Sequence, residues 1–382
     1  MNKHVSYIAE PTRPRRLWLS VATSLVISGL LLSNFLAYRS AHHESEHVNR
    51  AETIPSGPHY PESVRFLAKP PKLGFGTWQL DKSNVSEAVK TAIVTGYRHI
   101  DCASSYWNEP AVGRGIAAGL EKARLRREDI WVTSKLWNYH HHRVKEAFQD
   151  TLNDLGLDYL DLYLMHWPTQ GTYDPSDDQS VPPSHQPIGP HTIEFNKTWN
   201  EMSQLLITGK VRHIGVANFD PSQLSQLIAS SNVKPFAHQM ELHPYLPQTA
   251  WLQKHAELDI HLIAFSPLGN MNPIYGYPPK VDPPHSLDHP VIRRVAARRA
   301  CTPAQVILRW GMSRRDVAVI PKSSHEARIR ENFASTECAL RFEDYKDIET
   351  IAAAKAHRFN DPREEWNLMG PEGLYVGLDG TE

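Results

Sequence analysis

From about residue 66 onward, short apolar runs alternate with longer stretches in which apolar residues recur at helical spacing. Most of the apolar runs end in a polar residue, the pattern of strands buried on both faces of a parallel sheet. The strand candidates are residues 73–78, 99–103, 130–135, 160–166, 213–218, 237–241, 261–266 and 317–322. The helix candidates between them include residues 85–95, 111–125, 144–155, 195–207, 222–230, 248–257 and 302–312. This alternation predicts an α/β fold, either a closed (β/α)8 TIM barrel or a large open sheet.

Polar side chains occupy the ends of the predicted strands. They are Asp101, Lys135, His166, Asn218, Gln239, Ser266 and Lys322. In a parallel barrel the carboxyl ends of the strands meet at one rim, and the active site forms there. We therefore expect these side chains to surround one site.

The N-terminal part of the chain differs from the rest. Residues 17–38 contain no charged residue and are long enough for a transmembrane helix. Residues 1–16 are basic, and acidic residues follow the apolar run, so the positive-inside rule places the N-terminus in the cytosol. We favour a retained single-pass helix over a cleaved signal peptide, whose apolar core is shorter, and over a buried core helix. Residues 39–65 are polar and aperiodic and are predicted to be a flexible linker.

The composition of the chain limits which classes of partner and metal site are expected. The chain has 382 residues and a formal net charge of -1, which gives no electrostatic reason to expect a nucleic-acid partner. Cys102, Cys301 and Cys338 are too few and too scattered for a disulfide framework, and no CxxC pair suggests zinc. The histidines at 140–142 are consecutive and cannot all reach one ion, so we expect no metal site.

Four separated motifs carry a family resemblance. GYRHIDCASSYWNE (96–109), VTSKLWN (132–138), DLYLMHWP (161–168) and IPKSSHEARIRENF (320–333) resemble, in order, the signatures of the aldo-keto reductase family. GFGTWQL, VRHIGVANF, HQMELHPY and AFSPLG add support. The resemblance covers residues 66–358 and leaves 359–382 as a C-terminal tail. The sequence HRFNDPREEW resembles the fungal polyol- and glyceraldehyde-type reductases of the family. The family resemblance as a whole implies a barrel enzyme that reduces aldehydes or ketones to alcohols with NADPH.

The resemblance assigns catalysis to Asp101, Tyr106, Lys135 and His166. Carbonyl reduction requires a hydride at carbon and a proton at oxygen, and Tyr106 would donate the proton. A phenol has a pKa of about 10, so a neighbouring cation such as Lys135 favours proton exchange near neutrality. Asp101 would hold the ammonium in place, and His166 would hydrogen-bond and orient the carbonyl oxygen.

The resemblance also implies an adenosine 2′-phosphate subsite, which favours NADPH over NADH. Lys322 and Ser323 would contact the phosphate. Arg328 would pair with the phosphate and stack on the adenine, because a planar guanidinium suits both. Asn332 would hydrogen-bond the adenine.

At the nicotinamide end, the resemblance assigns hydrogen bonds to the carboxamide to Asn218 and Gln239, and contacts to the pyrophosphate to Ser266 and Leu268. Two positions depart from the family pattern. Ala217 stands where a serine is usual, so one hydroxyl contact is missing. Phe265 replaces the usual tyrosine under the nicotinamide, which keeps the stacking face and loses the hydroxyl.

Tryptophans near the strand ends indicate the substrate pocket. Trp78, Trp107 and Trp167 are predicted to line it, and Trp137 follows Lys135 closely. Aromatic walls exclude water and suit a hydrophobic or amphipathic carbonyl compound. Tryptophans also fill protein cores, so their identity alone does not assign them to the pocket.

Two questions stay open at this level. A membrane-attached, NADPH-binding regulatory module of the same fold, with little turnover, is the alternative to an enzyme. The flanking charges place the barrel outside the cytosol, whereas NADPH is most available inside it. Asn84 and Asn196 each begin a glycosylation sequon, which would be used only outside the cytosol.

Overall fold

The computed structural model describes residues 67–170, 194–269 and 284–361. In this part of the chain the predicted strands form one eight-stranded sheet in the order β1-β2-β3-β4-β5-β6-β7-β8. All neighbouring pairs are parallel. The strands are β1 (Phe75–Gly76), β2 (His99–Asp101), β3 (Trp131–Leu136), β4 (Leu160–Met165), β5 (Val211–Ala217), β6 (Ala237–Glu241), β7 (His261–Phe265) and β8 (Val317–Val319).

The last strand returns to the first. Leu73 forms a parallel bridge with Val319. The Gly74 N–H donates to the Val319 carbonyl at 2.8 Å, and the Val319 N–H donates to the Lys72 carbonyl at 2.8 Å. These bonds close the sheet, which makes the fold a (β/α)8 barrel and rules out the open sheet.

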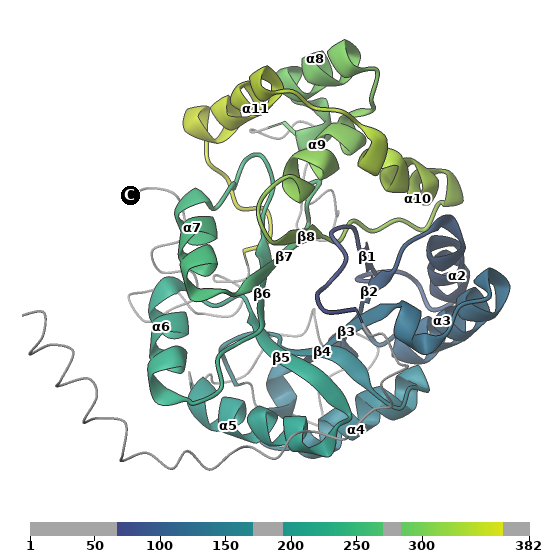
Figure 1. Ribbon diagram of the computed structural model, residues 1–382, viewed down its shortest axis with the longest axis vertical. Coiled ribbons are helices and arrows are strands. Elements are labelled where there is room, and N and C mark those ends of the chain that lie inside the picture. The colour runs from purple at the N-terminus through teal and green to yellow at the C-terminus, as the bar shows by residue number, and fades with distance from the viewer. Residues whose placement is uncertain (1–66, 171–193, 270–283, 362–382) are drawn as a thin grey trace, which may run out of the picture. The chain divides into compact units, whose positions relative to one another are not determined.

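Helices surround the strands in Figure 1. They are α2 (Val85–Thr95), α3 (Glu109–Ala123), α4 (Val144–Leu155), α5 (Phe195–Leu205), α6 (Pro221–Ser230), α7 (Thr249–Leu258), α8 (Pro290–Arg299), α9 (Pro303–Met312), α10 (Glu326–Phe333) and α11 (Phe342–Ala354). The start of α6 follows local chemistry: Asp220 accepts a hydrogen bond from the Gln223 N–H, and Pro221 occupies the first helical position.

Apolar side chains fill both faces of the sheet. Inside the barrel the core contains Trp131, Leu162, Leu164, Ala217, Ala237, Ile263, Ala318 and Ile320. A larger cluster, which includes Ile100, Val132 and Tyr163, joins the outer face to the helices. This double burial explains why the strands appear in the sequence as nearly continuous apolar runs.

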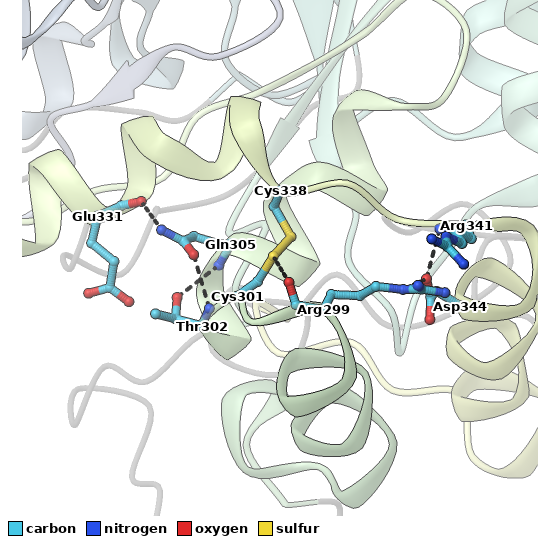
Figure 2. The surroundings of a disulfide bond; sticks show 8 residues. All are labelled: Arg299, Cys301, Thr302, Gln305, Glu331, Cys338, Arg341 and Asp344. Carbon is cyan, nitrogen blue, oxygen red and sulfur yellow. Dashed lines mark hydrogen bonds and ion pairs between the residues drawn. A yellow bond between two sulfur atoms is a disulfide. The ribbon is translucent and has the colours of Figure 1, made fainter.

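One disulfide joins Cys301, just before α9, to Cys338, which follows α10 and a short 3-10 turn (Figure 2). The sequence did not predict this pairing, because the two cysteines are 37 positions apart and no local motif connects them. Next to the disulfide, the Gln305 amide donates to the Glu331 carbonyl at 3.1 Å. The beginning of α9 and the end of α10 are therefore tied together twice.

The predicted N-terminal segment (1–16), membrane helix (17–38) and linker (39–65) lie outside the described residues, as does most of the tail. Among the helices that the structure describes, none is long and apolar enough to cross a bilayer.

Candidate active site

A cavity of about 840 Å³ lies at the carboxyl ends of the strands. Six of the seven polar strand-end residues line it: Asp101, His166, Asn218, Gln239, Ser266 and Lys322. The seventh, Lys135, is fully buried and contacts two of the lining residues, Asp101 and Tyr106. Residues that are far apart in the sequence thus converge because the barrel brings all strand ends to one rim.

A short hydrogen-bonded chain runs from the core to the cavity. Lys135 Nζ lies 2.5 Å from Asp101 Oδ1 and 3.2 Å from the Tyr106 hydroxyl. It also donates to the Cys102 carbonyl at 2.9 Å. The ammonium therefore has three acceptors in place, and its charge lies against the phenol oxygen.

Neighbouring side chains hold this chain in position. Gln239 Nε2 donates to the second carboxylate oxygen of Asp101 at 2.7 Å. Asn218 Nδ2 donates to the His166 carbonyl at 3.0 Å. The predicted carboxamide-binding residues are thus hydrogen-bonded to two of the predicted catalytic residues, which the sequence did not indicate.

Burial and neighbouring charges set the pKa values of Tyr106 and Lys135. Burial raises the pKa of Tyr106 to about 12, although the Lys135 charge and hydrogen bond pull it down. Burial opposes the charge of Lys135, but Asp101 and Tyr106 more than compensate, so the Lys135 pKa is raised. Tyr106 therefore stays protonated, and Lys135 stays charged, at neutral pH.

His166 is neutral at physiological pH. Burial, and then the nearby Lys135 charge, hold its pKa well below the usual value. Ser105 Oγ lies 3.4 Å from His166 Nδ1. With its proton on Nε2, the imidazole can accept the serine hydroxyl at Nδ1 and donate to a ligand from Nε2.

A second group of residues lines the cavity where β8 leads into α10. Lys322, Ser323, Arg328 and Asn332 all face it. Lys322 has part of its side chain exposed, and the partial burial of the rest lowers its pKa. No acidic side chain of the described residues offsets this shift. An ammonium and a guanidinium that line the same cavity suit an anionic phosphate.

The residues predicted to contact the nicotinamide and the pyrophosphate lie at or beside the cavity. Phe265, Ser266 and Leu268 line the cavity, and Ala217 is buried beside Gln239 in the β5–β6 register. Asn218 and Ser266 have φ of 60° and 45°. This left-handed region is uncommon for residues other than glycine and asparagine.

Aromatic side chains form part of the wall. Trp78, Trp137 and Trp167 line the cavity with Tyr106 and His166. Trp107, the third predicted pocket residue, is not among the residues that line this cavity. It follows the 3-10 turn 104–106 with φ 52°, and Lys82 Nζ lies 5.8 Å from its ring centroid. Its role in the pocket stays a prediction.

Several lining residues were not among the predicted site residues, and two of them come from segments far from the strand ends. Leu287 belongs to a short 3-10 turn (Ser286–Asp288) before α8, and Asn360 lies in the tail. Neither is part of a motif near a strand end. Among the described residues, no group of three or more His, Cys, Asp or Glu side chains could hold a metal ion.

The comparisons with known proteins agree with this geometry. Residues 72–353 match the model of the aldo/keto reductase family. A Schizosaccharomyces pombe protein described as an uncharacterized oxidoreductase is 42% identical over 316 residues, which are 82% of this chain and 92% of the relative. Aldo-keto reductase family 1 member A1 of Gallus gallus is 37% identical over 74% of this chain and 86% of its own length. The aldose reductase structure from Giardia lamblia has a TM-score of 0.71 at 37% identity, covering 78% of this chain and 97% of the other. The chain belongs to the aldo/keto reductase family of NAD(P)H-dependent oxidoreductases.

Proposed function

We propose that this protein reduces aldehydes or ketones to alcohols, that it prefers NADPH, and that Tyr106 donates the proton. One observation carries the proposal: the Asp101–Lys135–Tyr106 chain, with contacts of 2.5 and 3.2 Å, reaches a cavity that Lys322 and Arg328 also line. The first arrangement suits proton donation at a carbonyl oxygen. The second suits a phosphate-bearing cofactor.

The protein's own groups would act as follows. The neutral His166 donates a hydrogen bond to the carbonyl oxygen and orients the substrate beside Tyr106. Reduced nicotinamide, when bound, supplies the hydride. As negative charge grows on the substrate oxygen, Tyr106 releases its proton to it, and the Lys135 ammonium stabilises the phenolate that forms. Asp101 keeps the ammonium aligned through this change.

The preference for NADPH rests on charge. Lys322 and Arg328 line the same cavity and would face the 2′-phosphate that distinguishes NADPH from NADH. A hydrogen bond to a charged group contributes about 1.5–3 kcal/mol, equivalent to roughly a 10- to 150-fold change in affinity. We expect Arg328→Gln to lower kcat/KM for NADPH by at least about tenfold and to lower kcat/KM for NADH much less, because NADH loses only the stacking contact.

The purified full-length chain tests the proposal directly. It should oxidise NADPH in the presence of a short aldehyde, followed by absorbance. Tyr106→Phe should lower kcat by about 100-fold or more while NADPH still binds, because only proton donation is removed. Undiminished turnover in Tyr106→Phe would contradict the assigned proton donor.

The regulatory-module alternative gains no support from the described residues, since the groups needed for proton donation are all in contact there. Tight NADPH binding without turnover of any carbonyl compound would revive it.

We also propose that residues 17–38 span a membrane and that the barrel lies on the non-cytosolic side. The Cys301–Cys338 disulfide supports this side, because disulfides persist mainly in oxidising compartments. Asn84 is exposed at the start of α2, where a glycan could be attached. A glycosidase-sensitive size shift that Asn84→Gln removes is the expected result. Digestion of the barrel by protease added outside sealed microsomes would place it in the cytosol.

A further inference from the structure

A buried carboxylate at the end of β6 has no part in the chemistry described so far. Glu241 is fully buried, and it pairs with Phe265 in the β6–β7 register. Taking a carboxylate out of water is costly unless it is paired and hydrogen-bonded. The groups that hydrogen-bond to the Glu241 carboxylate therefore indicate its structural role.

Those contacts lead to the end of the described chain. The Phe359 N–H donates to Glu241 Oε1 at 2.7 Å, and the Asn360 N–H donates to Oε2 at 3.0 Å. His243 Nε2 lies 2.8 Å from Oε1, and Arg358 Nη1 lies 3.8 Å from Oε2. In Figure 1 the yellow segment that follows α11 runs toward the end of β6.

The carboxylate stays ionised at any working pH. Burial alone would raise its pKa, but the His243 hydrogen bond, the His243 and Arg358 charges and the Phe359 N–H lower it to about 2. Glu241 therefore stays charged as the acceptor for two N–H groups of residues 357–360, which we call the tail segment.

The tail segment in turn forms part of the cavity wall. Asn360 lines the cavity that also contains Tyr106 and His166. The ring of Phe359 lies against Gly269: a β-carbon added at Gly269, where φ is 74°, would come within 3.1 Å of that ring. Gly269 lines the cavity as well. The His357 N–H donates to the Tyr245 carbonyl at 3.1 Å, which gives the segment a further attachment to the β6–α7 loop.

We propose that Glu241 is a positioning residue for substrate recognition: it holds the tail segment in place as a wall of the carbonyl pocket through the N–H groups of Phe359 and Asn360. The proposal rests on the proposed carbonyl reductase function. Substrates long enough to reach Asn360 depend on Glu241, and those that contact only Tyr106 and His166 do not. The proton donor and its partners are unaffected.

Glu241→Gln in the full-length chain tests the role. The amide keeps the shape but places an NH2 group against one of the two tail N–H donors. We expect KM for benzaldehyde to rise at least about fivefold, while kcat and the KM for propanal change less than about twofold. Glu87→Gln, an exposed carboxylate paired with Lys90 on α2, is the matched control and should change nothing.

A second pair of variants avoids the core. Asn360→Ala keeps the backbone N–H that donates to Glu241, and Asn360→Pro removes it. Asn360→Pro should therefore raise KM for benzaldehyde further than Asn360→Ala, and Glu241→Gln should add little once Asn360→Pro is present. This pair decides the question if Glu241→Gln does not fold.

Hydrogen exchange separates this proposal from the proposed function, because it needs no substrate. The amides of Phe359 and Asn360 should be protected in the parent chain and lose at least about tenfold protection in Glu241→Gln. Unchanged exchange, or an equal loss of kcat for both aldehydes, would overturn the assignment. Loss of protection in a protein that reduces no aldehyde would leave the tail attachment standing and remove the proposed function instead.

Discussion

Removal of the Cys301–Cys338 disulfide provides a quantitative test of how the region around α9 and α10 is stabilised. The perturbation is the double variant Cys301→Ser/Cys338→Ser, compared with the parent chain before and after reduction by dithiothreitol. The disulfide closes a loop whose ends are 37 positions apart. A cross-link of this span removes about 13 cal/mol/K of entropy from the unfolded chain, equivalent to about 4 kcal/mol at 25 °C.

This free energy converts into a measurable shift in melting temperature. Unfolding entropy is about 2.1 cal/mol/K per residue near 60 °C, which gives about 0.6 kcal/mol/K for the matched residues 72–353. The expected decrease in Tm is therefore about 7 °C. Cys102 is fully buried and does not take part in the disulfide, so the double variant should not respond to dithiothreitol at all.

Scanning fluorimetry or calorimetry of the three samples measures the effect. The reduced parent and the double variant should melt at the same temperature, below the oxidised parent. If the oxidised parent and the double variant melt within about 1 °C of each other, the disulfide does not constrain the unfolded chain as argued. A response of the double variant to dithiothreitol would show that another thiol is involved.

Three further results are expected. Lys135→Met should lower kcat by about 100-fold or more with little change in NADPH affinity in a fluorescence titration, because the phenolate of Tyr106 loses its neighbouring cation. Ala217→Ser should lower the Kd for NADPH by about fivefold, since it restores a hydroxyl worth about 1 kcal/mol; an unchanged Kd would refute the missing contact. Burial lowers the pKa of His255 to about 4 and that of His238 well below its usual value. Unfolded histidine binds protons from about pH 6.5 downward, so urea titrations should show the free energy of unfolding falling between pH 6.5 and 4, by about 3 kcal/mol for His255 alone.

The strands and their polar ends were predictable because burial on both faces leaves an unmistakable run of apolar residues. β6 matches its predicted bounds, and so do α2 and α4. β8 is shorter than predicted, ending at Val319 and not at Lys322. Pro321 has no N–H to continue the ladder, and its carbonyl accepts instead from the Gly76 N–H at 3.0 Å. Local pattern cannot show where the chain leaves the sheet to enter the cavity.

The features that the sequence did not predict depend on contacts between distant segments. The disulfide, the attachment of Asn360 to Glu241 and the position of Trp107 have no periodicity or spacing that would indicate them. Glu241 and His243 both occur in HQMELHPY, a segment that already supported the family resemblance. The family resemblance includes this segment, but it did not show that the Glu241 carboxylate accepts hydrogen bonds from the tail segment.

Parts of the cavity wall are therefore built differently from the group around Tyr106. Asp101 and Lys135 lie in neighbouring strands of the barrel, and Tyr106 ends the 3-10 turn that follows β2 and contacts Lys135. Two parts of the wall depend on contacts made by segments outside the strands: the disulfide and the Gln305–Glu331 hydrogen bond near Asn332, and the hydrogen bonds from the tail segment to Glu241 near Asn360. Substitutions in these walls should change KM and cofactor preference while the distance between the ammonium and the phenol is kept. Substrate range in this protein can thus change without loss of the proton-donating step.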